Sequence, residues 1–134
     1  MSKQVFRLSL KSTYEESEKV PDFVSDIQKE SQLNEDTTGS LMLLLSEAVT
    51  NAIVHGNRLD EKKPVDVCVE VNEEAVISTV KDRGSGFDPH EANDPLKEEN
   101  LLKESGRGVF LIKEISDEVE YLENGTKIRF ILNR

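Results

Sequence analysis

The stretch SEAVTNAIVHGN, residues 46–57, places polar side chains on an otherwise apolar helix. Its apolar residues recur at helical spacing, which predicts a helix packed against a core. Glu47, Asn51 and His55 follow one another at intervals of four residues, so they form one stripe along that helix. A glutamate beside an apolar face is costly to bury unless it has a partner or a chemical task. The stripe is either a solvated edge or part of a site, and the helix alone favours the solvated edge.

The side chains of the stripe suit magnesium and proton transfer better than zinc. Asn51 offers a neutral oxygen, a donor that suits Mg²⁺, which takes few protein oxygens and completes its shell with phosphates and water. Glu47, one turn earlier, can accept a proton from a nucleophile. A zinc site at Glu47 and His55 is the weaker hypothesis, because the spacing is not the paired-histidine pattern and no third ligand is evident.

The helix that carries the stripe is the longest that the sequence predicts. It begins at Asn34, a favourable N-cap, and ends at Gly56. An alternating run in residues 4–12 predicts a strand before it. A further helix, regular from about Val20, is predicted between that strand and the central helix.

Two hairpins and a short helix are predicted downstream. Alternating runs joined at residues 72–74 form the first hairpin, and Asn124-Gly125 marks the turn of the second. A short helix in residues 106–117 lies between them. Antiparallel strands with helices on one face make an α+β two-layer sandwich, and we expect residues 1–134 to form one such domain.

The composition restricts the class of partner. The chain has 134 residues and a formal net charge of −10, which argues against a general affinity for nucleic acid or anionic membranes. We expect no signal peptide or membrane span, and therefore a soluble, cytoplasmic protein. Cys68 is the only cysteine, so an internal disulfide cannot form.

A second candidate site follows a predicted strand. Val76, Val80 and Asp82 share one face by the two-residue alternation, so the carboxylate points to the helix-covered side. It can accept a hydrogen bond from an exocyclic amine such as that of adenine. Gly84 and Gly86 allow positive φ and a close approach to a flat ring. An ordinary Asp-Gly turn explains the same residues equally well.

A third candidate site lies where the short helix begins. Gly106 and Gly108 flank Arg107, so backbone N–H groups, the helix dipole and a cation could together hold phosphate. A flexible helix start is the alternative interpretation. Thr126 adds a smaller cue, because it shares a strand face with inward residues, and its hydroxyl could share a ligand with Asp82.

Four motifs, EAVTNAIVHGN, DRGSGF, GRGVFLI and GTKIRF, resemble in order the N, G1, G2 and G3 boxes of the GHKL ATPase superfamily, whose fold is the Bergerat fold. The combination is most similar to the bacterial anti-sigma-factor serine/threonine protein kinases of the general-stress and sporulation type. This resemblance implies a histidine kinase-like ATPase domain that uses ATP and Mg²⁺. It also implies a lid over the triphosphate at residues 88–105.

The resemblance also implies a role for each motif residue. Glu47 would be the general base, and Asn51 would hold Mg²⁺. Asp82 would bind the adenine amine with help from Thr126, and Arg107 would reach the terminal phosphate. The glycines that would shape the pocket are Gly84, Gly86, Gly106 and Gly108.

Kinases of this type act on proteins. As homodimers they hold a sigma factor inactive, and they phosphorylate a serine or threonine of an anti-anti-sigma protein of the STAS fold. Two alternatives remain open: a nucleotide-gated binding protein without kinase activity, and a detached histidine-kinase catalytic domain. The presence of both Glu47 and Asn51 favours the kinase, because a pure binding module needs no base.

Overall fold

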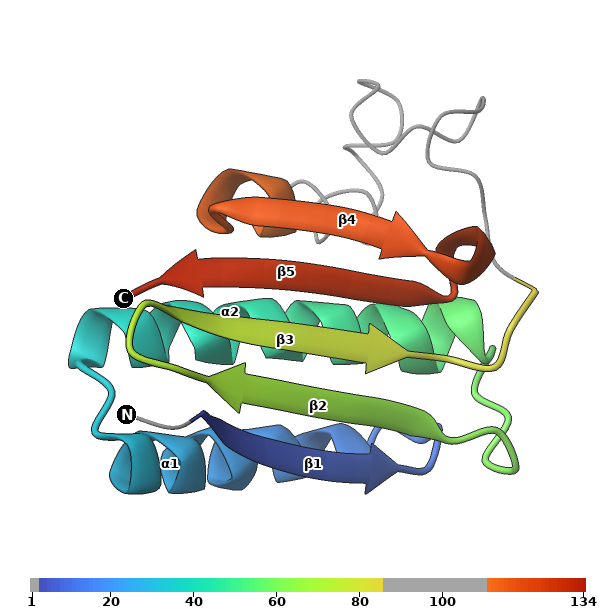
Figure 1. Cartoon of the computed structure of the whole chain (residues 1–134). Helices are drawn as coiled ribbons and strands as arrows, with labels where there is room; N and C mark the ends of the chain where they lie inside the picture. The colour runs from blue at the N-terminus through green and yellow to red at the C-terminus, as the bar shows by residue number, and fades with distance from the viewer. Residues whose placement is uncertain (1–2, 86–110) are drawn as a thin grey trace.

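Five antiparallel strands form one sheet in the computed structural model, which describes residues 3–85 and 111–134 (Figure 1). The strands lie side by side in the order β1-β2-β3-β5-β4. Their bounds are β1 Gln4–Leu10, β2 Val65–Val71, β3 Ala75–Lys81, β4 Glu118–Leu122 and β5 Lys127–Asn133. The predicted strand at the N-terminus and both predicted hairpins are confirmed.

The helices α1 and α2 lie together on one face of this sheet (Figure 1). A single 3₁₀ turn, η1 Glu16–Glu18, precedes α1 Lys19–Ser31. The central helix is α2 Glu35–Asn51, and it continues without interruption into a π-helical turn, η2 Ala52–Gly56. Residues 111–115 form a further helical segment before β4. The predicted α+β two-layer architecture is confirmed.

The core lies between α2 and the middle of the sheet. α2 packs against β3 and β5, and α1 packs against α2 and β1. The strands alternate between buried and part-exposed residues, as β2 shows along its whole length. The buried residues of α2 are Leu41, Leu44, Leu45, Ala48 and Val49. These apolar side chains remove the helix face from water and so fix α2 on the sheet.

The same helix also has the length and apolar composition of a membrane-crossing helix. Residues Glu35–Gly56 form 22 continuous helical residues, and an 18-residue window within them has a mean hydropathy of 1.2. Its fully buried residues face the sheet, however, which is the usual arrangement of a core helix. The apolar character of this helix is therefore explained by the packing of the domain.

Local capping explains where α2 begins. The Asn34 side chain accepts a hydrogen bond from the Thr37 N–H at 2.7 Å, as the sequence predicts for an N-cap. Glu35 and Asp36 place negative charge in the first turn, where the helix dipole favours it. The start of the central helix is thus set by residues at its own N-terminal end.

Gly39 provides a test of this description of α2. It lies inside the helix, and a β-carbon at this position would meet no atom within 4 Å. We expect Gly39→Ala to raise the free energy of unfolding by about 0.5–1 kcal/mol in urea denaturation, because alanine loses less backbone entropy in a helix. Gly125→Ala is the matched control, since Gly125 has a φ of 83° and alanine there should destabilise the protein. A loss of stability in Gly39→Ala would contradict the open helical environment.

Candidate functional site

The end of the central helix touches the residues that follow β3. A β-carbon added to Gly56, the last residue of η2, would overlap the carboxylate of Asp82. A β-carbon on Gly84 would overlap the carbonyl oxygen of Gly56. Glycine is therefore required at both positions by the close approach of two chain segments. The positive φ expected at Gly84 is wrong, because the positive-φ residues of the described chain do not include it.

Asp82 points to the helix-covered side of the sheet, as its place in the alternation predicts. It is 8 % exposed, and its Oδ1 atom accepts a hydrogen bond from the Gly84 N–H at 2.8 Å. Its own N–H donates to the carbonyl oxygen of Thr126 at 2.8 Å, which extends the contact between β3 and β5 by one residue. Burial raises the pKa of this carboxyl, and the Gly84 N–H and the charges of Lys81 and Lys63 offset part of that rise.

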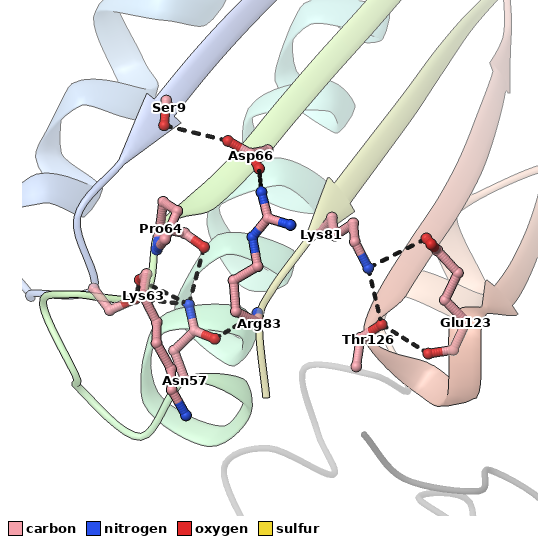
Figure 2. A network of polar contacts seen from close by, with 10 residues as sticks. Ser9, Asn57, Lys63, Pro64, Asp66, Lys81, Arg83, Glu123 and Thr126 are labelled. Atoms are coloured by element: carbon pink, nitrogen blue, oxygen red, sulfur yellow. Dashed lines mark hydrogen bonds and ion pairs between the residues drawn. The ribbon is translucent and has the colours of Figure 1, made fainter. Parts of the chain in front are cut away.

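Thr126 lies next to Asp82, but its hydroxyl is engaged elsewhere. β5 begins at Lys127, and Thr126 has helical dihedral angles of −81° and −10°, so the strand alternation does not reach it. Its Oγ1 atom donates to the Glu123 carbonyl oxygen at 2.7 Å and accepts from the Lys81 Nζ at 3.2 Å (Figure 2). Lys81 also pairs with the Glu123 carboxylate at 3.3 Å. The expectation that Thr126 continues the inward strand face is therefore wrong, and Thr126 contacts Asp82 through its backbone.

The polar stripe of the central helix divides where the helix changes form. Glu47 and Asn51 both belong to α2 and are both half-buried, so the spacing of four keeps them on one side of the helix. His55 lies in the π-helical turn η2 and is exposed. The exposure of His55 therefore distinguishes it from the half-buried Glu47 and Asn51. Glu47 and Asn51 remain as the paired candidates.

The sequence interpretation missed the part that Asn57 plays beside the site. Asn57 follows directly after the predicted helix end at Gly56, a position that suggests no more than a helix cap, yet its side chain is 1 % exposed and bonds to three other segments. Its Oδ1 atom accepts the Arg83 N–H at 2.6 Å (Figure 2). Its Nδ2 atom contacts the Ser12 hydroxyl oxygen and the carbonyl oxygens of Lys63 and Pro64, at 2.9, 2.9 and 3.1 Å respectively. An asparagine directly after a helix-ending glycine is the one local signal, and it does not distinguish a cap from such a network.

The remaining predicted site residues lie outside the described part of the chain. They are Gly86, Gly106, Arg107, Gly108 and the lid at residues 88–105. Within residues 3–85 and 111–134, no group of three His, Cys, Asp or Glu side chains is arranged to hold a metal ion.

The sequence also matches a known family of domains. The model of the histidine kinase-like ATPase domain aligns with residues 10–132, which include the central helix, Asp82 and the second hairpin. The chain belongs to the histidine kinase-like ATPase domain family. Membership of an ATPase family implies the use of ATP, and the two-layer α+β fold accords with it.

Several bacterial regulatory proteins are similar to this histidine kinase-like domain. An anti-sigma F factor of Clostridium perfringens is 38% identical over 89 residues, covering 63% of this chain and 64% of the relative. A serine-protein kinase RsbW of Staphylococcus epidermidis is 34% identical over 100 residues, covering 66% of this chain and 61% of the relative. An anti-sigma F factor of Bacillus thuringiensis is 40% identical over 83 residues, covering 60% and 57%. The aligned region thus spans less than two thirds of these relatives.

The buried carboxylate of this ATPase domain should leave a signature in the pH dependence of stability. Because burial raises the pKa of Asp82 above its ordinary value, the folded state binds the proton more tightly than the unfolded state. The stability contribution of Asp82 is therefore complete below the ordinary aspartate pKa and is lost as the pH rises through the raised pKa. We expect Asp82→Asn to be more stable than the wild type at pH 7 without nucleotide, because its amide oxygen can still accept the Gly84 N–H without a buried charge.

Urea denaturation of both proteins at a series of pH values checks this expectation. The difference in unfolding free energy should be small at low pH and should grow as the pH rises. A difference that stays constant across the series, or a wild type that is the more stable protein at pH 7, would contradict the burial of a charged Asp82.

Proposed function

We propose that this domain is an ATP–Mg²⁺-dependent serine/threonine protein kinase that also acts as an anti-sigma factor. The observation that carries the proposal is the contact between the Asp82 loop and the end of the helix that bears Glu47 and Asn51. It brings a buried carboxylate next to a helix whose polar stripe suits phosphate chemistry. The similarity to proteins named anti-sigma F factor and serine-protein kinase RsbW supports the same activity.

Asp82 is the proposed adenine-binding residue. Gly84 occupies one lone pair of Oδ1 with its N–H, so the carboxylate is oriented before a ligand arrives while acceptor capacity remains. A carboxylate in a buried position discriminates strongly for an amine donor, because the unpaired charge is costly. Thr126 is proposed to assist in adenine binding through its backbone, whose carbonyl oxygen accepts the Asp82 N–H. Gly84 is proposed to support this pocket by allowing the close approach of its segment to Gly56, and Gly86 is proposed to allow a close approach to the adenine ring.

Asn51 is the proposed magnesium ligand. Its side chain is half-buried at the end of α2 and supplies one neutral oxygen. This fits an ion that takes one or two protein oxygens and receives its other ligands from phosphates and water. Arg107, between Gly106 and Gly108, is proposed to contact the terminal phosphate, and residues 88–105 are proposed as the lid.

Glu47 is the proposed general base of phosphoryl transfer. The hydroxyl oxygen of a substrate serine or threonine attacks the γ-phosphorus of ATP, and the bond from that phosphorus to the β,γ-bridging oxygen breaks. The products are a phosphorylated side chain and ADP, and the hydroxyl proton passes to the Glu47 carboxylate. Glu47 lies one helical turn from Asn51, so base and metal ligand can act at the same phosphates.

The proposed partners are two proteins. The kinase substrate is an anti-anti-sigma protein of the STAS fold, and the inhibited protein is a sigma factor, which the domain binds as a cytoplasmic homodimer. Residues 1–134 are proposed to act as a single domain. A nucleotide-gated regulator without kinase activity is the second candidate, because relatives named anti-sigma F factor are named for binding.

A transfer assay with a variant of the base distinguishes these candidates. The purified protein is mixed with ATP, Mg²⁺ and a STAS-fold partner, and the partner is searched for phosphoserine or phosphothreonine. We expect Glu47→Ala to lower the transfer rate by at least about 10²-fold, because general bases contribute about 10²–10⁴-fold, while nucleotide binding is retained. Glu35→Ala, at the exposed start of the same helix, is the control and should transfer at nearly the wild-type rate. If the wild type binds ATP yet transfers no phosphate, the non-catalytic regulator is the better description.

A second variant tests the metal ligand separately. We expect Asn51→Ala to weaken ATP binding in the presence of Mg²⁺ by about tenfold or more, because hydrogen-bond or ligand contacts to charged groups contribute about 1.5–3 kcal/mol. Binding of ATP with the metal chelated should change little. Calorimetric titration with and without Mg²⁺ provides both values, and equal losses in the two conditions would exclude Asn51 as the magnesium ligand.

A further inference from the structure

The Asn57 side chain is the most completely bonded polar group beside the candidate site. Its amide nitrogen and oxygen both lie within hydrogen-bond distance of partners, and the residue is 1 % exposed. A buried amide that satisfies its donors and acceptor is held in one orientation, because any rotation would leave buried groups unpaired. Asn57 is therefore a rigid anchor that follows directly after Gly56.

This anchor holds one end of the loop that carries Asp82. The Arg83 N–H donates to Asn57 Oδ1 at 2.6 Å. The N–H of Asp82, one residue earlier, donates to the Thr126 carbonyl oxygen. The N–H of Gly84, one residue later, donates to the Asp82 carboxylate. The three consecutive amides at residues 82–84 are thus all engaged. The Arg83 guanidinium also bonds to Asp66 at 2.8 Å, on the neighbouring strand β2 (Figure 2).

The position of the loop is important because the Asp82 carboxylate is in tight contact with the end of the helix. The Asp82 carboxylate lies against Gly56 so closely that a single methyl group would collide with it. A shift of the loop would therefore move the carboxylate relative to the helix end. The hydrogen bond from the Arg83 N–H to Asn57 Oδ1 connects these same two segments through adjacent residues, so it restrains such a shift.

We propose that Asn57 is a positioning residue for base recognition: by holding the Arg83 amide, it fixes the Asp82 carboxylate where it selects an adenine over a guanine nucleotide. The inference rests on the proposed role of Asp82 as the adenine acceptor. Adenine presents an exocyclic amine that a carboxylate can accept, whereas guanine presents a carbonyl oxygen at that position. Two acceptors facing each other in a buried place are repelled, and a well-placed carboxylate therefore rejects guanine.

The ratio of the dissociation constants for GTP and ATP measures this positioning directly. We expect the wild type with Mg²⁺ to bind ATP at least about 10²-fold more tightly than GTP, the range of a site built around a polar contact. Asn57→Ala should reduce that ratio by about tenfold or more, because small displacements of positioning groups have large effects. A loss of stability alone lowers the folded fraction for both nucleotides equally and leaves the ratio unchanged.

Ser12→Ala is the matched control from the same network. The Ser12 hydroxyl is buried, accepts from Asn57 Nδ2 at 2.9 Å and donates to the Lys63 carbonyl oxygen at 2.6 Å, but it does not touch Arg83. Removing it damages the same buried cluster and leaves the bond between Asn57 and Arg83. We expect Ser12→Ala to lose stability while its GTP/ATP ratio stays within about twofold of the wild type, since the Arg83 N–H still donates to Asn57 Oδ1 in this variant.

The outcomes separate the inference from the proposed function. If the wild type binds no ATP, or does not prefer ATP to GTP, the adenine role of Asp82 fails and the inference fails with it. If the wild type prefers ATP and folded Asn57→Ala retains the wild-type ratio, the inference is overturned while the ATP site stands. A ratio that falls equally in Ser12→Ala also overturns it, because the effect then belongs to the whole cluster.

Amide hydrogen exchange of the wild type tests the anchor without any variant. We expect the Arg83 amide to be protected before nucleotide is added, because its hydrogen bond to Asn57 is part of the free protein. The measurement remains decisive if Asn57→Ala does not fold. Rapid exchange of the Arg83 amide in the nucleotide-free protein would overturn the proposal.

Discussion

No room remains for a side chain between Gly56, at the end of the central helix, and the carboxylate of Asp82 after β3. This contact connects the two described parts of the candidate site. The apolar face of α2 packs on β3 and β5, and that packing drives the helix end against the end of the sheet. The half-buried Glu47 and Asn51 lie on the helix that makes the contact. The contact therefore joins the residues proposed for phosphate chemistry to the residue proposed for base recognition.

Burying the Asp82 carboxylate has an energetic cost that a purely structural role does not explain. Asp82 is buried without an ion-pair partner among the described residues, and burial raises the pKa of its carboxyl. A charge in such a place destabilises the free protein and is available to a ligand that presents a donor. Natural proteins commonly lose stability at residues that serve binding. The burial of Asp82 thus supports its proposed role in a site, in addition to its position in a motif.

The periodic parts of the fold and of the site could be predicted from the sequence. Period-two alternation predicted strand pairs and the inward direction of Asp82, and period-four spacing placed Glu47 and Asn51 on one side of a helix. Prediction failed where periodicity ends. The helical dihedral angles of Thr126 show that the alternation of β5 begins only at Lys127. This departure occurs at the end of an element, where local hydrogen bonds compete with the regular pattern.

The sequence by itself determined the elements, their order, the start of the central helix at Asn34 and the polar residues that flank its core face. Each depends on neighbours a few positions apart, which a single chain segment contains. Only the tertiary structure decided why Gly56 and Gly84 must be glycine and what Asn57 does. Gly56 contacts Asp82 and Gly84, which follow the β2–β3 hairpin in the sequence. Asn57 bonds to segments 45 and 26 residues away. The roles of both residues therefore exist only after the sheet and the helix have packed.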